Sequence, residues 1–513
     1  MAIVGSILKE FVHRKANNSD KPANVHPHKV QTETLKKLLE RAKNTDFGNA
    51  NNFQLITNSS DPVRTFQKNV KLYNYVNMLD EWWHMALEGK EDVCWPGKIK
   101  YFGLTSGTSD SASKRVPLSI DMIRAIRKVA IKQILSLYHF DLPASFFNKK
   151  ILMLGGSISL NYTNGHFEGD LSGILAGNFP SWFLNFYKPG ARIAKIKDWE
   201  EKLNKIVLQA PKWDVGCVAG VPAWIQILME KIIEKYNLDN IHEIWPNLKF
   251  YAHGGVSFKP YEKSFKSLLG SPINYLETYL ASEGFIAYQN GTSEGMDLVL
   301  DNGMFFEFVP FTYENFTSAG ELKPNAQTLV LNEVNKDTEY AILLSTCAGA
   351  WRYLIGDTIK FTSLNPPRIV ITGRTKHFLS LCGEHMSVDN MDSAIKEISE
   401  KFNLNINEYT VSGIKYDTLF AHKWYIGTDK LDIAPEKIKK ELDKSLKKLN
   451  DDYATERKAA LKEVIVELVP NQHFYDWMAL KGKAGGQHKF PRVLKNEMLD
   501  DWEQFIAGKE TKG

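Results

Sequence analysis

A short segment rich in hydroxyl side chains, residues 101–114, is the part of the sequence best suited to hold a polyphosphate. Hydroxyl groups donate hydrogen bonds to anionic oxygen, a glycine lets backbone N–H groups approach a ligand closely, and a lysine adds positive charge. The alternative for this segment taken alone is a serine-rich surface turn. The candidate phosphate contacts are Thr105, Ser106, Gly107, Thr108, Ser109 and Lys114.

The usual nucleotide-binding loops do not match this segment. The P-loop pattern G-x-x-x-x-G-K-[ST] places a glycine directly before the lysine. Here Ser113 precedes Lys114 and Arg115 follows it. The sequence also has no G-x-G-x-x-G after a predicted strand. If the segment holds ATP, it therefore does so in another fold class.

Two later segments could contact the rest of a nucleotide. Ala252-His-Gly-Gly255 places a double glycine at the end of a predicted strand, where it could form a flat platform for a base; a simple turn is the alternative. Glu277-Thr-Tyr-Leu-Ala-Ser-Glu-Gly284 sets carboxylates beside small residues. Because proteins usually bind Mg²⁺ through one or two carboxylates plus phosphate oxygens, this segment could hold magnesium.

Two more segments carry polar groups that a simple core does not need. Trp351-Arg-Tyr-Leu-Ile-Gly-Asp357 ends in an aspartate that could accept hydrogen bonds from both ribose hydroxyls, or could cap a turn. Residues 482–492 form a glycine-rich loop with Lys489 and Arg492. A lysine on such a loop could enter a site and leave it; a solvated basic loop is the alternative.

The elements around these segments alternate between helix and strand, which predicts an α/β body with a largely parallel sheet. An apolar repeat with helical spacing covers residues 119–140, and Ser119 can cap that helix. A second helix is predicted over residues 222–236. Ligands of such sheets gather at the loops that follow the strands. The predicted strands occupy residues 151–154, 213–220 and 248–252.

A change of pattern near residue 370 predicts a second, smaller domain. Helices are expected from Ser387 and over residues 435–449, and strands near residues 409–413, 423–427 and 463–469. This is the content of a small α+β domain of about 140 residues.

Composition excludes several classes of protein. The chain has 513 residues with a net charge of +4, which is too balanced to indicate nucleic-acid binding. No run of 18 apolar residues is present, so we expect no membrane span. Residues 1–15 lack the features of a signal peptide and suggest a helix docked on the body, with a membrane-surface role as the minor alternative.

The cysteines and histidines indicate neither a zinc site nor a redox motif. The four cysteines form no C-x-x-C pair and the thirteen histidines no H-x-x-x-H pattern, so we expect no protein-held transition metal. Reduced cysteines in the cytoplasm are the default expectation. The cysteines are Cys94, Cys217, Cys347 and Cys382.

Taken in order, the hydroxyl segment, Y-x-A-S-E-G, W-R-Y-x-x-G-D and K-x-P-R resemble the Gretchen Hagen 3 family of acyl acid amido synthetases, which belongs to the adenylate-forming superfamily. The resemblance extends from about residue 60 to residue 500, and we expect a bacterial member. It implies a large N-terminal ATP- and acyl-binding domain with mainly parallel sheets over residues 1–372. A hinge at 373–376 and a mobile α+β domain at 377–513 would follow.

The resemblance also implies roles for the positions that match. The hydroxyl segment and Lys114 would hold phosphates, Glu283 would bind Mg²⁺, Asp357 would contact the ribose, and Lys489 would be the mobile catalytic lysine. The catalytic residues would thus be Lys489, Glu283 and Lys114. The other matching positions are Gly254 and Gly255 for adenine, Tyr279, Ala281 and Ser282 beside Glu283, Tyr353 and Gly356 beside Asp357, and Gly373, Arg374 and Lys376 at the hinge.

The implied activity is ATP- and Mg²⁺-dependent conversion of a small carboxylic acid to an acyl-adenylate, followed by transfer to an amino acid. Transfer to a thiol such as coenzyme A, and a non-enzymatic protein that binds an acid or a nucleotide, remain the alternatives. The chain departs from the family pattern at Asp110, which should point away from phosphate, at Leu280, and over residues 378–386. The last of these leaves the acceptor the least defined part of the hypothesis.

Overall fold

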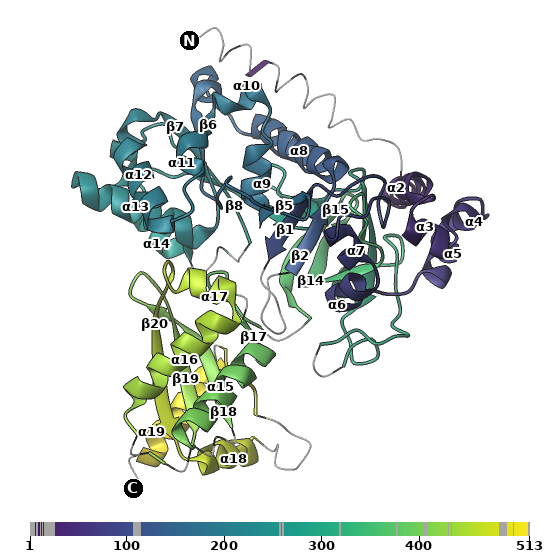
Figure 1. The fold of residues 1–513 in the computed structure, drawn as a ribbon. Helices are drawn as coiled ribbons and strands as arrows, with labels where there is room; N and C mark the ends of the chain where they lie inside the picture. The colour runs from purple at the N-terminus through teal and green to yellow at the C-terminus, as the bar shows by residue number, and fades with distance from the viewer. Residues whose placement is uncertain are drawn as a thin grey trace. The chain divides into compact units, whose positions relative to one another are not determined.

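The computed structural model describes most of the chain, and it divides into two compact units (Figure 1). The first lies within residues 1–105 and 114–376, and the second within residues 377–513. The described residues are 26–105, 114–255, 258, 261–317, 320–375, 378–384, 386–404, 406, 408–428, 430–431, 433–481, 490–495 and 497–510, together with Ser6, Lys9, Glu10, Val12 and Arg14.

An 11-stranded sheet runs through the first unit. From one edge to the other it consists of β12 (Met304–Pro310), β13 (Glu339–Thr346), β14 (Tyr353–Leu364), β15 (Pro367–Arg374), β11 (Met296–Leu298), β10 (Gly284–Tyr288), β9 (Asn274–Ala281), β8 (Phe250–Gly254), β7 (Val215–Ala219), β3 (Lys150–Met153) and β6 (Tyr187–Lys188).

The direction of the strands changes at β9. Strands β6, β3, β7, β8 and β9 pair in parallel, whereas every pair from β9 through β10 to β12 is antiparallel. Parallel strands need a crossover, usually a helix, and no helix is found among the described residues between β9 and β15. The predicted α/β class is confirmed, but the expectation of mainly parallel sheets holds only for the β6–β9 half.

A second, 4-stranded sheet carries the hydroxyl segment. Its strands, in order, are β2 (Lys114–Leu118), β1 (Tyr101–Thr105), β5 (His166–Asp170) and β4 (Asn161–Thr163). Strands β1 and β2 pair antiparallel, with Thr105 opposite Lys114. The two ends of the hydroxyl segment are therefore fixed side by side by strand pairing.

The two long helices predicted in the first unit form close to the expected positions. Helix α8 (Ile120–Leu135) begins after Ser119, whose hydroxyl accepts a hydrogen bond of 2.9 Å from the Met122 N–H, as an N-cap should. It ends five residues before the predicted limit, where a 3₁₀ turn at Ser136–His139 takes over. Helix α13 covers Pro222–Tyr236, as predicted.

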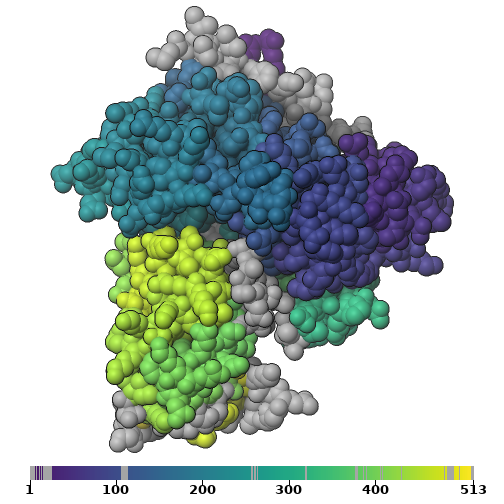
Figure 2. All heavy atoms as spheres, in the orientation of Figure 1, coloured from purple at the N-terminus to yellow at the C-terminus, as the bar shows by residue number. Residues whose placement is uncertain are grey.

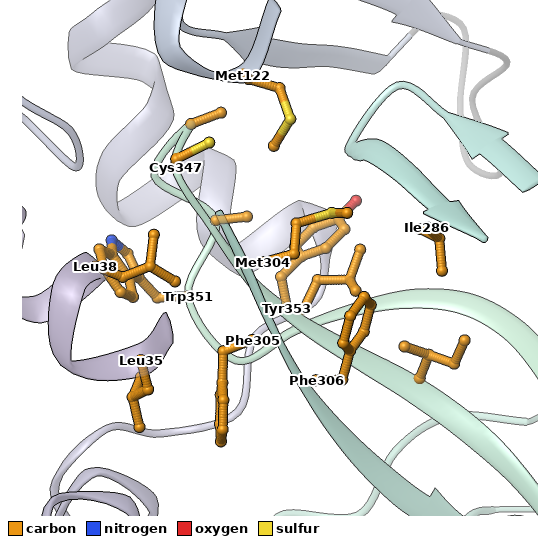
Figure 3. Packing of buried hydrophobic residues seen from close by; sticks show 14 of the residues in the cluster. Leu35, Leu38, Met122, Ile286, Met304, Phe305, Phe306, Cys347, Trp351 and Tyr353 are labelled. Carbon is orange, nitrogen blue, oxygen red and sulfur yellow. The ribbon is translucent and has the colours of Figure 1, made fainter. Parts of the chain in front are cut away.

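The largest hydrophobic core joins helix α2 (Pro27–Ala42) to strands β12 and β14 (Figure 3). Leu35 and Leu38 of α2 lie beside Trp351 and Phe305, and Met304 lies near Tyr353. In the space-filling view, residues of α2 and the helices that follow it gather in purple at one end of the first unit (Figure 2). Trp351 is completely buried, so the segment that leads to Asp357 begins inside this core.

The second unit is the small α+β domain predicted from the sequence. A 3-stranded sheet holds β18 (Tyr409–Tyr416), β19 (Leu419–Gly427) and β20 (Leu461–Val469) in that order. Helix α15 (Val388–Phe402) packs against α16 (Pro435–Leu449), and α16 packs against β20. The apolar side chains Ile438, Leu442 and Leu446 of α16 are fully buried, in accord with their helical spacing.

The helix predicted at the N-terminus is only partly described, whereas all four cysteines lie within the described residues. Val12 is buried, and Lys9 Nζ donates a 2.6 Å hydrogen bond to the Leu142 carbonyl, which supports a helix docked on the body. Within the described part of the chain, none of the helices has the length and apolar content to cross a bilayer. All four cysteines are free; three are buried and Cys217 is partly buried.

Candidate functional site

Asp357 lies within strand β14 and not at a turn, so the turn-cap alternative is wrong. It faces Arg374 across the β14–β15 ladder. The preceding residue, Gly356, has φ of +96°, a conformation that favours glycine, and its carbonyl accepts a 2.8 Å hydrogen bond from the Thr375 N–H. The strand register therefore places a cationic side chain opposite the aspartate.

The two carboxylate oxygens of Asp357 have different partners. The Tyr279 hydroxyl donates a 2.6 Å hydrogen bond to Oδ2, and Arg374 Nε lies 2.9 Å from Oδ1. The side chain is largely buried, and burial together with the Asp357 charge raises the pKa of Tyr279 well above its usual value. Since a carboxylate can accept about four hydrogen bonds, each oxygen keeps capacity for a hydroxyl, which fits a ribose diol.

Glu283 occupies the turn between β9 and β10, close to the same group. Its side chain is mostly buried, and burial raises the pKa of its carboxyl group while Lys114 and Arg374 act to lower it. Burial raises the pKa of the Tyr353 hydroxyl well above its usual value, and the nearby Glu283 carboxylate acts in the same direction. Glu283 is thus a mostly buried carboxylate that is under the influence of two cationic side chains, Lys114 and Arg374.

Any magnesium ion here would depend on ligand oxygens. In the part of the chain that the structure describes, no three His, Cys, Asp or Glu side chains are grouped so as to hold a metal. One carboxylate with phosphate oxygens is, however, a usual environment for Mg²⁺. Glu283 therefore fits a metal that arrives with a triphosphate.

The β9–β10 turn packs against the strand that leads into the hydroxyl segment. A Cβ atom at Gly103 of β1 would lie 3.4 Å from Ser282 Oγ, so Gly103 lets the two elements approach. At the other end of the segment, Lys114 Nζ lies 5.4 Å from the centre of the Tyr75 ring, and its charge acts on Glu283. Thr105, Lys114, Ser282 and Glu283 are thereby brought into one region.

The double glycine lies at the carboxyl end of β8, next to the part of β9 that carries Tyr279. Gly254 pairs with Thr278, and a Cβ atom at Gly254 would lie 2.4 Å from the Thr278 carbonyl oxygen, which leaves no room for a side chain. Gly255 follows with φ of +83°. The predicted strand end is confirmed, and these glycines leave bare backbone beside the Tyr279–Asp357 pair, as a base platform needs.

The structure brings most of the predicted site residues together. The grouped residues are Thr105, Lys114, Gly254, Gly255, Tyr279, Ala281, Ser282, Glu283, Tyr353, Gly356, Asp357, Gly373 and Arg374. The remaining predictions concern residues outside the described part of the chain, namely Ser106, Gly107, Thr108, Ser109, Lys376 and Lys489. Gly373 and Arg374 belong to strand β15, so regular structure continues into the predicted hinge.

Tyr75 contributes to the site although no sequence pattern pointed to it. Its hydroxyl accepts a 2.8 Å hydrogen bond from the Arg115 N–H, and its ring lies under Lys114. The Trp83 ring contacts both Tyr75 and Tyr353, with centroid distances of 6.1 and 5.4 Å. Tyr75 reaches the site only through tertiary packing, so a scan for polar motifs could not have found it.

Arg352, inside the W-R-Y motif, has a structural role. Its guanidinium forms a buried ion pair with Glu307 at 2.9 Å and donates to the carbonyls of Gln67 and Val70 at 2.7 and 2.6 Å. Its φ is +43°, which is unusual for a residue with a side chain. Arg352 therefore anchors the segment whose later residue Asp357 enters the site.

Comparison with known proteins places the chain in a family. Models of the GH3 family N-terminal, central and C-terminal domains match residues 22–166, 298–374 and 389–498. A jasmonoyl–L-amino acid synthetase, JAR6 of Nicotiana attenuata, is 22% identical over 97% of this chain and 96% of its own length. A probable indole-3-acetic acid-amido synthetase, GH3.11 of Oryza sativa subsp. japonica, is 23% identical over 49% of this chain and 41% of its own length.

Solved structures share the fold over nearly the whole chain. The GH3.15 acyl acid amido synthetase in complex with 2,4-DB has a TM-score of 0.57 at 16% identity and covers 98% of this chain and 96% of its own. A 2-hydroxyisobutyryl-CoA ligase in complex with 2-HIB-AMP and CoA has a TM-score of 0.58 at 14% identity, with 94% and 92% coverage. The three domain models together match well over half of the sequence in the expected order, and the chain belongs to the GH3 (Gretchen Hagen 3) family.

Proposed function

We propose that this protein activates a carboxylic acid with ATP and transfers the acyl group to the amine of an amino acid. The observation that carries the proposal is the Asp357 carboxylate, held by Tyr279 and Arg374 on the same sheet edge as Gly254 and next to Glu283. Relatives named as amido synthetases for jasmonic and indole-3-acetic acid support the reaction type.

In the first step the acid carboxylate attacks the α-phosphorus of ATP, a new O–P bond forms, and pyrophosphate leaves. Asp357 and Tyr279 orient the ribose, while Lys114 and the hydroxyl segment neutralise the β- and γ-phosphates. Magnesium beside Glu283 would offset charge on the triphosphate when bound. Lys489 would stabilise the charge that develops at the α-phosphate. Positioning and charge neutralisation are the main tasks of a protein in such a transfer.

In the second step the amino acid nitrogen attacks the acyl carbonyl carbon, a C–N bond forms, and AMP leaves with the bond electrons while the nitrogen loses a proton. We retain residues 373–376 as the proposed hinge about which the smaller domain would move between steps. The boundary between the two compact units falls directly after Lys376, which supports this choice. We also propose a cytoplasmic location, which the four free cysteines support.

Transfer to coenzyme A is the second candidate, because a CoA ligase shares the fold as closely as a GH3 amido synthetase does. The two candidates share the first step and differ in the acceptor. AMP release that depends on an added amino acid favours the proposal, whereas release that depends on coenzyme A favours the alternative.

ATP–pyrophosphate exchange with aryl, indole and aliphatic acids in the presence of Mg²⁺ tests the first step. Exchange with one acid class, strongly reduced in Asp357→Asn but kept in the surface control Asp301→Asn, supports adenylation at this site. Normal exchange in Lys489→Ala contradicts the role given to that lysine. ATP binding without exchange for any acid favours the non-enzymatic alternative.

A further inference from the structure

A second glycine loop, residues 155–159, follows strand β3 at the edge that carries Gly254 and Gly255. In open α/β sheets, ligands bind at the carboxyl ends of parallel strands. The loop lies next to the end of β7, because the Leu154 N–H donates a 2.9 Å hydrogen bond to the Ala219 carbonyl. Gly254 and Gly255 end strand β8, and the loop after β3 lies at the same ends of the parallel strands, two strands further along the sheet.

Neighbouring residues approach the backbone of this loop so closely that two glycine positions leave no room for a side chain. A Cβ atom at Gly156 would lie 2.1 Å from Asp170 Oδ2, and one at Gly173 would lie 2.2 Å from the Ser157 carbonyl oxygen. The Gly156 N–H donates a 2.9 Å hydrogen bond to Ser172 Oγ. Glycine is therefore required on both sides of this contact.

Asp170 connects this loop to the phosphate side of the site. It ends strand β5 and lies in register with Leu104 of β1, the residue before Thr105. Because a Cβ atom at Gly156 would collide with the Asp170 side chain, the loop backbone packs directly against the residue that ends β5. Asp170 thus lies between the glycine loop and the strand that enters the hydroxyl segment.

Lys202 lies beneath the loop, on helix α12 (Trp199–Gln209). Its side chain is only 4% exposed, and Nζ donates a 3.2 Å hydrogen bond to the Gly155 carbonyl. Burial lowers the pKa of this amine, and the Asp170 charge acts in the opposite direction. Burying an ammonium group is unfavourable unless it is paired, so a lysine among the buried Leu203 and Ile206 needs a reason beyond packing.

We propose that Lys202 is a positioning residue for the acid substrate: its hydrogen bond to Gly155 holds the glycine loop in the conformation that shapes the acid end of the site. The inference rests on the proposed function, because it assigns the loop to the acid of the adenylation step. The Lys202 side chain would not touch the reacting atoms. It acts through the loop backbone.

The test compares Lys202→Met, Lys202→Arg and the control Lys205→Met. Methionine fills the space of the lysine stem without a donor, and Lys205 is exposed on the same helix. Two quantities are measured for each variant: KM and kcat for acid and for ATP in pyrophosphate exchange, and amide hydrogen–deuterium exchange of the peptide covering residues 155–159.

In Lys202→Met we expect KM for the acid to rise roughly tenfold, as for loss of a hydrogen bond to a charged group. KM for ATP should stay within about twofold of the control, and the loop amides should exchange faster. Lys202→Arg should recover part of both effects.

An equal rise of both KM values, or loop exchange unchanged from Lys205→Met, would overturn the proposal. If wild-type protein exchanges no pyrophosphate with any acid, the proposed function fails and the acid role of Lys202 fails with it. The amide measurement then still decides whether Lys202 anchors the loop.

Discussion

Asp357 and Arg374 are cross-strand partners, with 2.9 Å between Asp357 Oδ1 and Arg374 Nε. One member is the proposed ribose acceptor and the other lies at the start of the proposed hinge. Because the strand register fixes this pair, a rotation about residues 373–376 would have to keep or break it. The following predictions test this pair, the buried Arg352–Glu307 ion pair of the first unit and the buried Glu384–His422 contact of the second.

Asp357→Asn should lower kcat/KM for ATP by about 10- to 100-fold, because hydrogen bonds to a charged group contribute about 1.5–3 kcal/mol. Tyr279→Phe, which removes one donor to Asp357, should lower it only several-fold. Pyrophosphate exchange at varied ATP measures both. Tyr162→Phe, at an exposed tyrosine, is the control. Equal ATP kinetics in Asp357→Asn and the control would contradict the ribose role.

Arg374→Ala should impair adenylation more than Arg374→Lys does. Lysine keeps the positive charge near Asp357 and Glu283, whereas alanine removes it and leaves Asp357 with Tyr279 as its partner. Lysine cannot reproduce the planar donor geometry, so rescue should be partial. Single-turnover formation of the acyl-adenylate measures the effect. Identical rates in the alanine and lysine variants would show that charge at this position is unimportant.

Arg352→Met should destabilise the first unit by about 3–5 kcal/mol, because it leaves the Glu307 carboxylate buried without its partner. Urea unfolding monitored by tryptophan fluorescence measures the loss. Adding Glu307→Leu to Arg352→Met should restore part of the stability, since the unpaired charge is then gone. The ATP KM of the folded fraction should not change; a large rise would mean that Arg352 also holds Asp357 in position for the nucleotide.

Glu384 of the second unit should make a pH-dependent contribution to stability. It is fully buried and 2.8 Å from His422 Nε2. Burial alone would raise its pKa, but hydrogen bonds and charge from His422 and the Cys382 N–H bring it from the usual 4.5 to about 2. A folded-state pKa below the unfolded one means that the stabilisation is present above about pH 4.5 and is lost as pH falls towards 2.

Glu384→Gln should therefore cost about 1.5–3 kcal/mol at pH 7, and the difference from wild type should shrink as the pH approaches 2. Urea unfolding of the second unit at several pH values measures this. Glu400→Gln is the control, because Glu400 is exposed and 4.0 Å from Lys396. A pH-independent difference would contradict the charge-based explanation. If the difference shrinks with falling pH as expected, Glu384 would also give residues 378–386, which depart from the family pattern, a structural function.

The sequence predicted elements whose pattern is local. Helix α13 matched at both ends, and α8 began at its predicted cap, because apolar spacing and a capping hydroxyl act within a few residues. The antiparallel half of the large sheet was not foreseen, since an apolar run does not reveal the direction in which its strand pairs. The early end of α8 was also missed, because the apolar face continued through Leu137 into the 3₁₀ turn.

The same distinction applies to the site. Glycine and carboxylate motifs were visible because their residue types are unusual at strand ends. The approach of Ser282 to Gly103, and of Tyr75 to Lys114, depends on packing between segments far apart in the chain. The turn-cap alternative for Asp357 could not be dismissed from the sequence for a related reason: only the β15 register shows that the strand continues past it.

The buried cysteines make this protein suited to site-directed labelling. Burial raises the pKa of Cys217 and Cys347 to about 12 and that of Cys94 and Cys382 well above the usual value. Thiolates are the species that react with maleimides, so all four native side chains should label slowly. One surface cysteine introduced into each unit would therefore be labelled selectively. Energy transfer between the two dyes would then report any motion between the units during turnover, in a chain that is otherwise native.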